Sequence, residues 1–141
     1  MTSFGYIWCV QWMMGVVLNT TPLSIDQSGI QFYPGSLQEV RSEAALQDKL
    51  VFVEVYADWC TVCKVMEEST FRNPEVVDLI DQHYLAWKVN IESTPGKLFA
   101  IQEGIKVLPS LLVLDKNGRQ LSKIDQALQP SALLKVLKSH L

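Results

Sequence analysis

Two cysteines three positions apart, Cys60 and Cys63, are the residues of this 141-residue chain whose spacing most directly indicates chemistry. If a helix begins at Cys60, their side chains lie one turn apart, within reach of a disulfide with a Cα separation of about 5.5 Å. Such a pair can open and close without refolding of the chain. We therefore predict a redox pair, with Cys60 as the attacking thiolate and Cys63 as the resolving thiol.

A structural zinc ion is the main alternative for a Cys-x-x-Cys pair, but such a site needs four nitrogen or sulfur ligands. Beyond Cys60 and Cys63, the chain offers only Cys9, His83 and His140, at no metal-site spacing. We therefore predict no metal and no organic cofactor, because the dithiol itself carries the electrons. Three cysteines are also too few for a disulfide scaffold, and Cys9 has no predicted role.

The residues before the pair form an apolar run, Leu50 to Tyr56, which is typical of a strand covered on both faces. A helix is expected to follow from about Cys60 to about Thr70. A free cysteine titrates at about pH 8.5, so exchange near neutrality requires stabilisation of the thiolate. The unpaired N–H groups at the start of the helix supply that stabilisation at a strand-to-helix junction.

Two carboxylates are candidates for the proton transfer that Cys63 needs. Glu54 interrupts the buried strand, where loss of water should favour its neutral form and so raise its pKa, which makes its carboxylate form a suitable proton acceptor. Glu67 follows Cys63 by four positions and Cys60 by seven, on the same helical stripe. We predict both as catalytic. The alternatives are a solvated helix position for Glu67, and a structural role or a strand-edge position for Glu54.

The remaining expected elements alternate between helix and strand. They are a helix from the capping box at Ser36 to about Lys49 with Leu46 on its inner face, a helix capped by Asn73, a strand over 84–91, a helix capped by Thr94, a strand over 110–115, a hairpin strand over 119–124 and a helix over 130–140. Alternation requires parallel strands, and the hairpin adds an antiparallel pair. We predict an α/β fold with a central mixed sheet flanked by helices on both faces.

The N-terminal region differs from the rest, because no charged side chain precedes Asp26. As a helix, the apolar stretch over 4–18 would reach about 22 Å, short of a hydrocarbon thickness of about 30 Å. We predict an apolar segment plus linker over 1–28 and one domain over 29–141. Three interpretations of the segment stay open: a secretory signal or membrane anchor, the end of a transmembrane helix of a longer protein, or a segment folded onto the domain.

The bulk composition is that of an ordinary globular domain, with 48% hydrophobic and 19% charged residues. A net charge of -3 gives no indication of a nucleic-acid partner. We expect a monomer.

The segment Val53 to Lys64, which contains Trp-Cys-x-x-Cys-Lys, resembles the thioredoxin superfamily, most closely the C-terminal thioredoxin-like domain of bacterial thiol:disulfide interchange proteins of the DsbD type. Glu67 and the run Leu108-Pro109-Ser110 add to the resemblance, which extends from about residue 30 to the end. It implies the thioredoxin fold with the cysteine pair at a helix N-terminus. Two departures stand out: Ser110 where threonine is usual, and no Gly-Phe-like pair over 125–128.

The resemblance also implies a substrate surface beside the cysteines. A cis peptide bond between Leu108 and Pro109 would expose the Leu108 backbone to an extended substrate segment, and Trp59 would supply an apolar contact. An ordinary trans proline and a core position for Trp59 are the alternatives.

We therefore predict a thiol-disulfide oxidoreductase, acting as a protein-disulfide reductase between redox partner proteins. The expected location is the bacterial periplasm, free or attached to the inner membrane through residues 4–18. The alternatives are a cytoplasmic reductase, a disulfide isomerase or oxidase, and a thioredoxin-fold binding or assembly module with little turnover. The dipeptide Thr61-Val62 between the cysteines does not determine the direction of electron flow.

Overall fold

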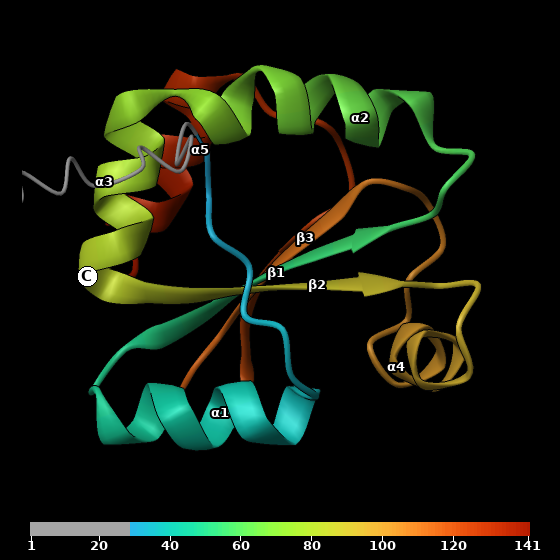
Figure 1. The fold of residues 1–141 in the computed structure, drawn as a ribbon, viewed down its shortest axis with the longest axis horizontal. Coiled ribbons are helices and arrows are strands. Elements are labelled where there is room, and N and C mark those ends of the chain that lie inside the picture. Colours follow the sequence, from blue (N-terminus) through green and yellow to red (C-terminus); the bar gives the residue numbers. More distant parts are fainter. Residues whose placement is uncertain (1–28) are drawn as a thin grey trace, which may run out of the picture.

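The computed structural model describes residues 29–141 (Figure 1). The predictions for residues 1–28, including the apolar segment and Cys9, lie outside the described residues. In chain order the elements are α1 Leu37–Leu46, β1 Leu50–Tyr56, α2 Thr61–Glu68, a 3-10 turn Thr70–Arg72, α3 Pro74–His83, β2 Tyr84–Asn90, α4 Thr94–Gln102, β3 Ser110–Leu114, β4 Gln120–Ile124 and α5 Pro130–Lys138.

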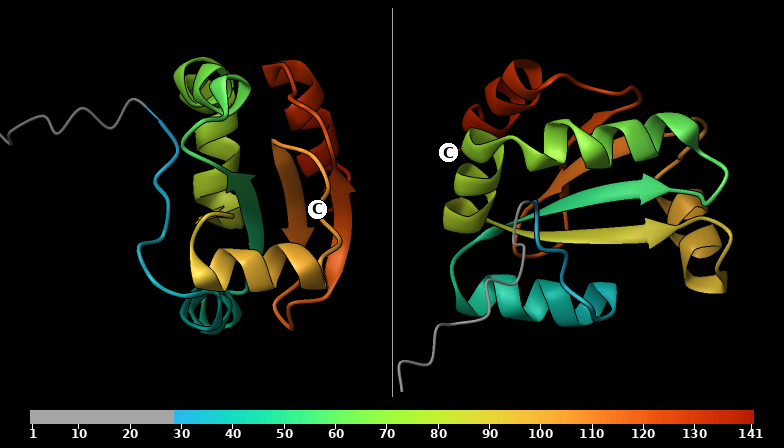
Figure 2. Two further views of the ribbon diagram at one scale, coloured as in Figure 1. Left: turned by 90° about the vertical axis from the view of Figure 1, so that its right-hand side faces the viewer. Right: turned by 45° about the horizontal axis from the view of Figure 1, so that its top comes forward.

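The strands form one mixed four-stranded sheet in the order β2-β1-β3-β4. β1 and β2 are parallel, whereas β3 is antiparallel to β1 and β4 is antiparallel to β3. Figures 1 and 2 show α1 and α4 on one side of the sheet and α2, α3 and α5 on the other. The predicted α/β fold, with helices on both faces of a mixed sheet, is confirmed.

The two larger clusters of the core lie one on each face of the sheet. Because side chains alternate along a strand, Val51, Val53 and Val55 of β1 pack toward α1 and α4, and Phe52 packs toward α2, α3 and α5. Glu54 has the same parity as Phe52, so it lies on the face that α2 covers. The side chains of β3 alternate in the same way: Leu111 packs in the cluster that contains Phe52, and Leu112 packs in the cluster on the opposite face.

The capping box at the start of α1 is confirmed, because the Ser36 hydroxyl accepts from Glu39 N and the Glu39 carboxylate accepts from Ser36 N. The expectation for Leu46 is wrong, since its side chain is 83% exposed. The buried positions of α1 are Val40 and Ala44. Leu46 follows Ala44 by two residues, about 200° around the helix, and therefore lies on its outer side.

Two helix starts differ by one residue from the prediction. α2 begins at Thr61 with Cys60 as its N-cap, and it ends at Glu68 before the short 3-10 turn. α4 is capped by Ser93 rather than Thr94, and the Ser93 hydroxyl accepts from Gly96 N at 3.1 Å. In both cases the cap residue keeps an extended backbone, so it stands outside the helix that it caps.

One further segment, which we name the N-terminal strap (residues 29–33), runs beside β2 before α1 begins (Figure 1). Ile30 N donates to Phe71 O at 2.9 Å and Tyr33 N donates to Ala86 O at 2.7 Å. Phe32 forms a parallel bridge with Ala86. The strap therefore joins the outer edge of β2 to the 3-10 turn that follows α2, a contact that the sequence pattern did not indicate.

Candidate active site

The cysteine pair lies where β1 ends and α2 begins. Cys60 and Cys63 form the predicted disulfide, with a Cα separation of 5.3 Å. Cys63 N donates to Cys60 Sγ at 3.2 Å, so an amide of the first helical turn points at this sulfur. Cys60 is 5% exposed and Cys63 is 1% exposed, so Cys60 is the more accessible residue of the pair.

A small apolar cluster surrounds the disulfide. Ala57 is buried with the two cysteines, and Leu108 packs against them from the loop before β3. The Leu108–Pro109 peptide bond is cis, and Pro109 is buried. Trp59, by contrast, is 65% exposed, which excludes the core alternative for this side chain. Residues far apart in the sequence thus meet at one end of the sheet, where β1 ends and the antiparallel β3 begins.

Glu54 is fully buried, and within residues 29–141 neither of its carboxylate oxygens has a hydrogen-bond partner. Burial is the main cause that raises the pKa of Glu54 to about 8; the Glu67 charge raises it further, and the Lys88 charge lowers it. A carboxyl group with such a pKa can take up and release a proton near neutrality.

Glu67 forms an ion pair with Lys88, whose Nζ lies 3.2 Å from Glu67 Oε1. Both side chains are about one-third exposed, so the pair lies at the protein surface. Lys88 is also the register partner of Glu54 across β1 and β2. The ion pair therefore links Glu67 of α2 to Lys88, the residue that lies beside buried Glu54 in the sheet.

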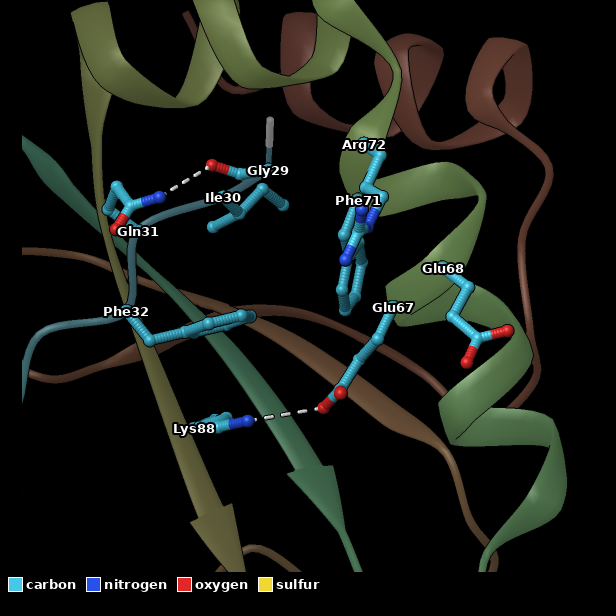
Figure 3. A pocket seen from close by; sticks show the side chains of 9 residues that line it. All are labelled: Gly29, Ile30, Gln31, Phe32, Glu67, Glu68, Phe71, Arg72 and Lys88. Carbon is cyan, nitrogen blue, oxygen red and sulfur yellow. Dashed lines mark hydrogen bonds and ion pairs between the residues drawn. The ribbon is translucent and has the colours of Figure 1, made fainter. Parts of the chain in front are cut away.

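Two pockets meet at this ion pair. One reaches the disulfide and is lined by Tyr56, Ala57, Asp58, Cys63, Lys64, Glu67 and Lys88. The other lies between the N-terminal strap and the end of α2 (Figure 3), lined by Gly29, Ile30, Gln31, Phe32, Glu67, Glu68, Phe71, Arg72 and Lys88. Because Glu67 and Lys88 line both, the pair forms part of the wall that separates Cys63 from the strap.

Lys88 is a site residue that the sequence reasoning missed, although the sequence contains a signal for it. β1 and β2 each have seven residues, and each carries one charged side chain, at its fifth position. Parallel pairing from the first residue of each strand brings Glu54 and Lys88 side by side. Two apolar strands with opposite charges at matching positions therefore indicated a pair across the sheet.

The two departures from the family pattern are in contact. The hydroxyl of buried Ser110 lies 2.5 Å from Asp125 Oδ1 and 3.1 Å from the Val107 carbonyl oxygen. Ser110 directly follows Pro109, and Asp125 directly follows β4. The hydrogen bonds thus tie the loop that carries Leu108 and Pro109 to the end of β4, and the sequence alone gave no reason to connect these positions.

Comparison with known proteins agrees with this geometry. A family model described as a thioredoxin-like domain matches residues 37–141. The chain belongs to this thioredoxin-like family. It is 30% identical to the thiol:disulfide interchange protein DsbD of Pseudomonas fluorescens over 88 residues, 62% of the chain and 15% of that protein. It is 36% identical to DsbD of Tatumella citrea over 87 residues, 60% of the chain and 14% of that protein. The chain thus spans about one-seventh of these relatives.

Solved structures share the fold of this thioredoxin-like domain. A thioredoxin from Thermus thermophilus superposes with a TM-score of 0.71 at 18% identity, covering 79% of this chain and 87% of that one. The oxidised C-terminal domain of DsbD from Neisseria meningitidis superposes with a TM-score of 0.62 at 20% identity, covering 72% of this chain and 90% of that one. At these identities, the likeness concerns the fold.

Residues 29–141 contain neither a metal-type cluster nor a membrane-spanning helix. No group of three or more histidine, cysteine or acidic side chains is arranged to hold a metal ion. No helix in this part of the chain combines the length and apolarity that crossing a membrane requires.

Proposed function

We propose that this domain is a thiol-disulfide oxidoreductase that passes electrons to other proteins by dithiol-disulfide exchange. The observation that carries the proposal is the Cys60–Cys63 disulfide at the start of α2, with the Cys63 amide donating to Cys60 Sγ. A hydrogen bond to sulfur and the helix N-terminus both favour the thiolate over the thiol. Similarity to thiol:disulfide interchange proteins of the DsbD type supports the same reaction.

The reduced form would react in two steps. The Cys60 thiolate attacks one sulfur of a partner disulfide, the partner's S–S bond breaks, and a mixed disulfide forms while the other partner sulfur leaves as a thiolate. Cys63 then loses its proton and attacks Cys60 Sγ, which breaks the mixed disulfide and closes the Cys60–Cys63 bond. Two electrons pass to the partner, which leaves as a dithiol once protons are taken up.

Glu54 would accept the proton that Cys63 loses in the second step. Its burial and its raised pKa support this role, because an acid already ionised well below neutrality would be a weak proton acceptor. Glu67 would act with it, through its charge on Glu54 and through its ion pair with Lys88.

The partner protein would bind at the exposed side of the disulfide. Trp59 offers a largely exposed ring, and Val62 and Val65 of α2 expose apolar side chains nearby in sequence. On the other side, Leu108 packs against the cysteines and Pro109 follows it. An extended segment of the partner could pair with the Leu108 backbone, as in binding by strand addition.

An aromatic disulfide that releases a coloured thiolate at each step tests both steps on the reduced chain with Cys9→Ser, because Cys9 is a third thiol that would release a further thiolate. This Cys9→Ser chain is the wild-type reference of the assay. Wild type should release one thiolate as Cys60 attacks and a second as Cys63 resolves the mixed disulfide. Cys60→Ser should abolish both phases, Cys63→Ser should abolish only the second, and Glu54→Gln should slow the second. An unchanged second phase in Glu54→Gln from about pH 6 to about pH 9 would contradict the role of Glu54.

Reduction of insulin, with Cys60→Ser as its control, separates an enzyme from a binding module. Activity that disappears in the variant supports the oxidoreductase, and no activity in either protein supports a module with little turnover. We also propose the reducing direction. A measured reduction potential of about -120 mV for the Cys60–Cys63 pair would identify an oxidant and contradict this direction.

The remaining proposals concern the whole chain in the cell. We propose that the domain works as a monomer on the periplasmic side of a bacterial inner membrane, with residues 1–28 as signal or anchor and residues 29–141 as the catalytic domain. Similarity to the bacterial thiol:disulfide interchange proteins is our reason for proposing this location. The intact mass of the protein recovered from cells tests the role of residues 1–28. Its distribution between membrane and soluble fractions tests the location, and its mass from light scattering tests the monomer.

A further inference from the structure

The ammonium group of Lys88 lies between two aromatic rings. Its Nζ is 5.3 Å from the ring centroid of Phe32 and 5.0 Å from that of Tyr56, and it is paired with Glu67. Both ring distances fall within the limit of about 6 Å for a cation-π contact. Lys88 is therefore held by three separate segments: the N-terminal strap, β1 and α2.

The ring of Phe32 has a defined position although it lies outside every helix and named strand. The backbone of Phe32 bridges Ala86 of β2, and its ring meets the Phe71 ring edge to face at 5.9 Å between centroids. Figure 3 shows the side chain reaching from the strap across β2 toward Phe71, with Lys88 and Glu67 close by. Phe32 can thus act as a fixed wall for the ammonium group.

Lys88 matters for the site because of the groups that face Glu54. Lys88 approaches from β2 and Glu67 from α2, and these two charges act on the Glu54 carboxyl in opposite directions. On the other neighbouring strand, β3, the register partner of Glu54 is the uncharged Leu111. Under the proposed function, the Cys63 thiol of the reduced protein gives its proton to this carboxyl group. Lys88 is therefore the cation that favours ionisation of this buried acid.

We propose that Phe32 is a positioning residue of the redox site: together with Tyr56, its ring holds the Lys88 ammonium where the positive charge acts on Glu54. The inference rests on the proposed function, since it concerns the proton step in which Cys63 resolves the mixed disulfide. Phe32 itself touches neither sulfur. It acts through Lys88, so a segment at the beginning of the domain adjusts proton transfer at the disulfide.

The test measures the pH dependence of the second coloured-thiolate phase, with the full chain in its reduced form and with Cys9→Ser in every variant, so that only Cys60 and Cys63 react. Phe32→Leu keeps an apolar side chain but removes the π face that attracts the ammonium group. With Lys88 less well held, Glu54 should ionise at higher pH, and the midpoint of the second phase should rise by roughly half a pH unit. Phe32→Tyr keeps a ring and should restore the wild-type midpoint. Gln31→Ala, an exposed neighbour on the strap, is the matched control and should leave the midpoint unchanged.

A double substitution distinguishes action through Lys88 from simple packing. In a Lys88→Met background no ammonium remains to be positioned, so adding Phe32→Leu should not move the midpoint further. An equal shift in that background would mean that Phe32 acts by covering Glu54, and would overturn the inference. A Phe32→Leu midpoint identical to wild type would also overturn it. Phe32→Met provides a second ring-free variant if Phe32→Leu folds poorly.

Failure of the proposed function would give a different experimental result from failure of the inference about Phe32. A reduced wild-type chain with no second phase would overturn dithiol exchange, and this inference with it. A normal wild-type second phase with an unmoved Phe32→Leu midpoint would overturn the inference alone.

Discussion

At the scale of single residues, Glu54 combines a proposed catalytic use with a cost in stability. The side chain is fully buried in β1, and within residues 29–141 its carboxylate has no hydrogen-bond partner. Ionising such a group inside the fold is unfavourable because protein does not replace the lost water. A buried apolar side chain at the same position would be expected to stabilise the domain, so the acid indicates a functional requirement.

We predict that the free energy of unfolding decreases with pH because of Glu54. Its pKa is raised from an ordinary value of 4.5 to about 8, so between these values the unfolded chain releases a proton that the folded protein keeps. The stability contribution is complete below about pH 4.5 and lost as pH rises through about 8. At pH 7 the loss should be on the order of 3 kcal/mol.

Urea unfolding of the oxidised protein at a series of pH values measures this effect, since neither disulfide-bonded cysteine titrates. Glu54→Gln has no carboxyl group to ionise, so the decrease assigned to Glu54 should be absent from its curve. Parallel curves for the two proteins would contradict the burial of an ionisable Glu54.

At the scale of elements, the site depends on how loops join the strands to the helices that follow them. α4 begins directly after the loop that follows β2, and its first turn packs on that loop. A Cβ at Gly96 would lie 1.9 Å from the Asn90 carbonyl oxygen and 2.9 Å from Ser93 Oγ. Only glycine therefore allows α4 to begin this close to the end of β2.

We predict that Gly96→Ala destabilises the domain by about 1–3 kcal/mol, because either the backbone of the loop or α4 must move. Gly29→Ala is a suitable control, since its Cβ would meet its nearest neighbour at an ordinary 3.4 Å. Urea unfolding of both variants checks the prediction. Equal stabilities would show that the α4 start tolerates a side chain.

At the scale of the whole molecule, the sheet couples two cores into one folding unit. β1 and β3 contribute side chains to both clusters, and the neighbours Leu111 and Leu112 of β3 point to opposite faces. Both are 0% exposed. Loss of either side chain should therefore weaken the same cooperative transition, as in other small domains.

We predict that Leu111→Ala and Leu112→Ala each destabilise the domain by about 2–5 kcal/mol while keeping a single transition. Tryptophan fluorescence and far-ultraviolet circular dichroism should give the same midpoint for each variant. Leu46→Ala is the control, since an exposed position should change stability by less than about 0.5 kcal/mol. Two separate transitions in one variant would contradict coupling between the faces.

The sequence by itself was sufficient for the elements and for the cysteine chemistry. Cap residues, prolines and apolar runs are local signals, so β1 and the start of α3 agree with their predicted positions. The spacing of Cys60 and Cys63 within one helical turn indicated a disulfide before any fold was known. Leu46 shows the limit of such signals, because an apolar residue near the end of a short helix can face either the core or the solvent.

Only the tertiary structure decided which distant residues share the site. Strand register placed Lys88 beside Glu54, the strap brought Phe32 to Lys88, and packing joined Ser110 to Asp125. The matching positions of Glu54 and Lys88 in their strands were a signal in the sequence, but only the strand order made the two neighbours. The contacts of Phe32 and Ser110 depend on the course of loops, which no local pattern encodes. The cysteine pair thus lies in one short motif, while the surroundings that we propose to adjust its proton transfer exist only in the folded domain.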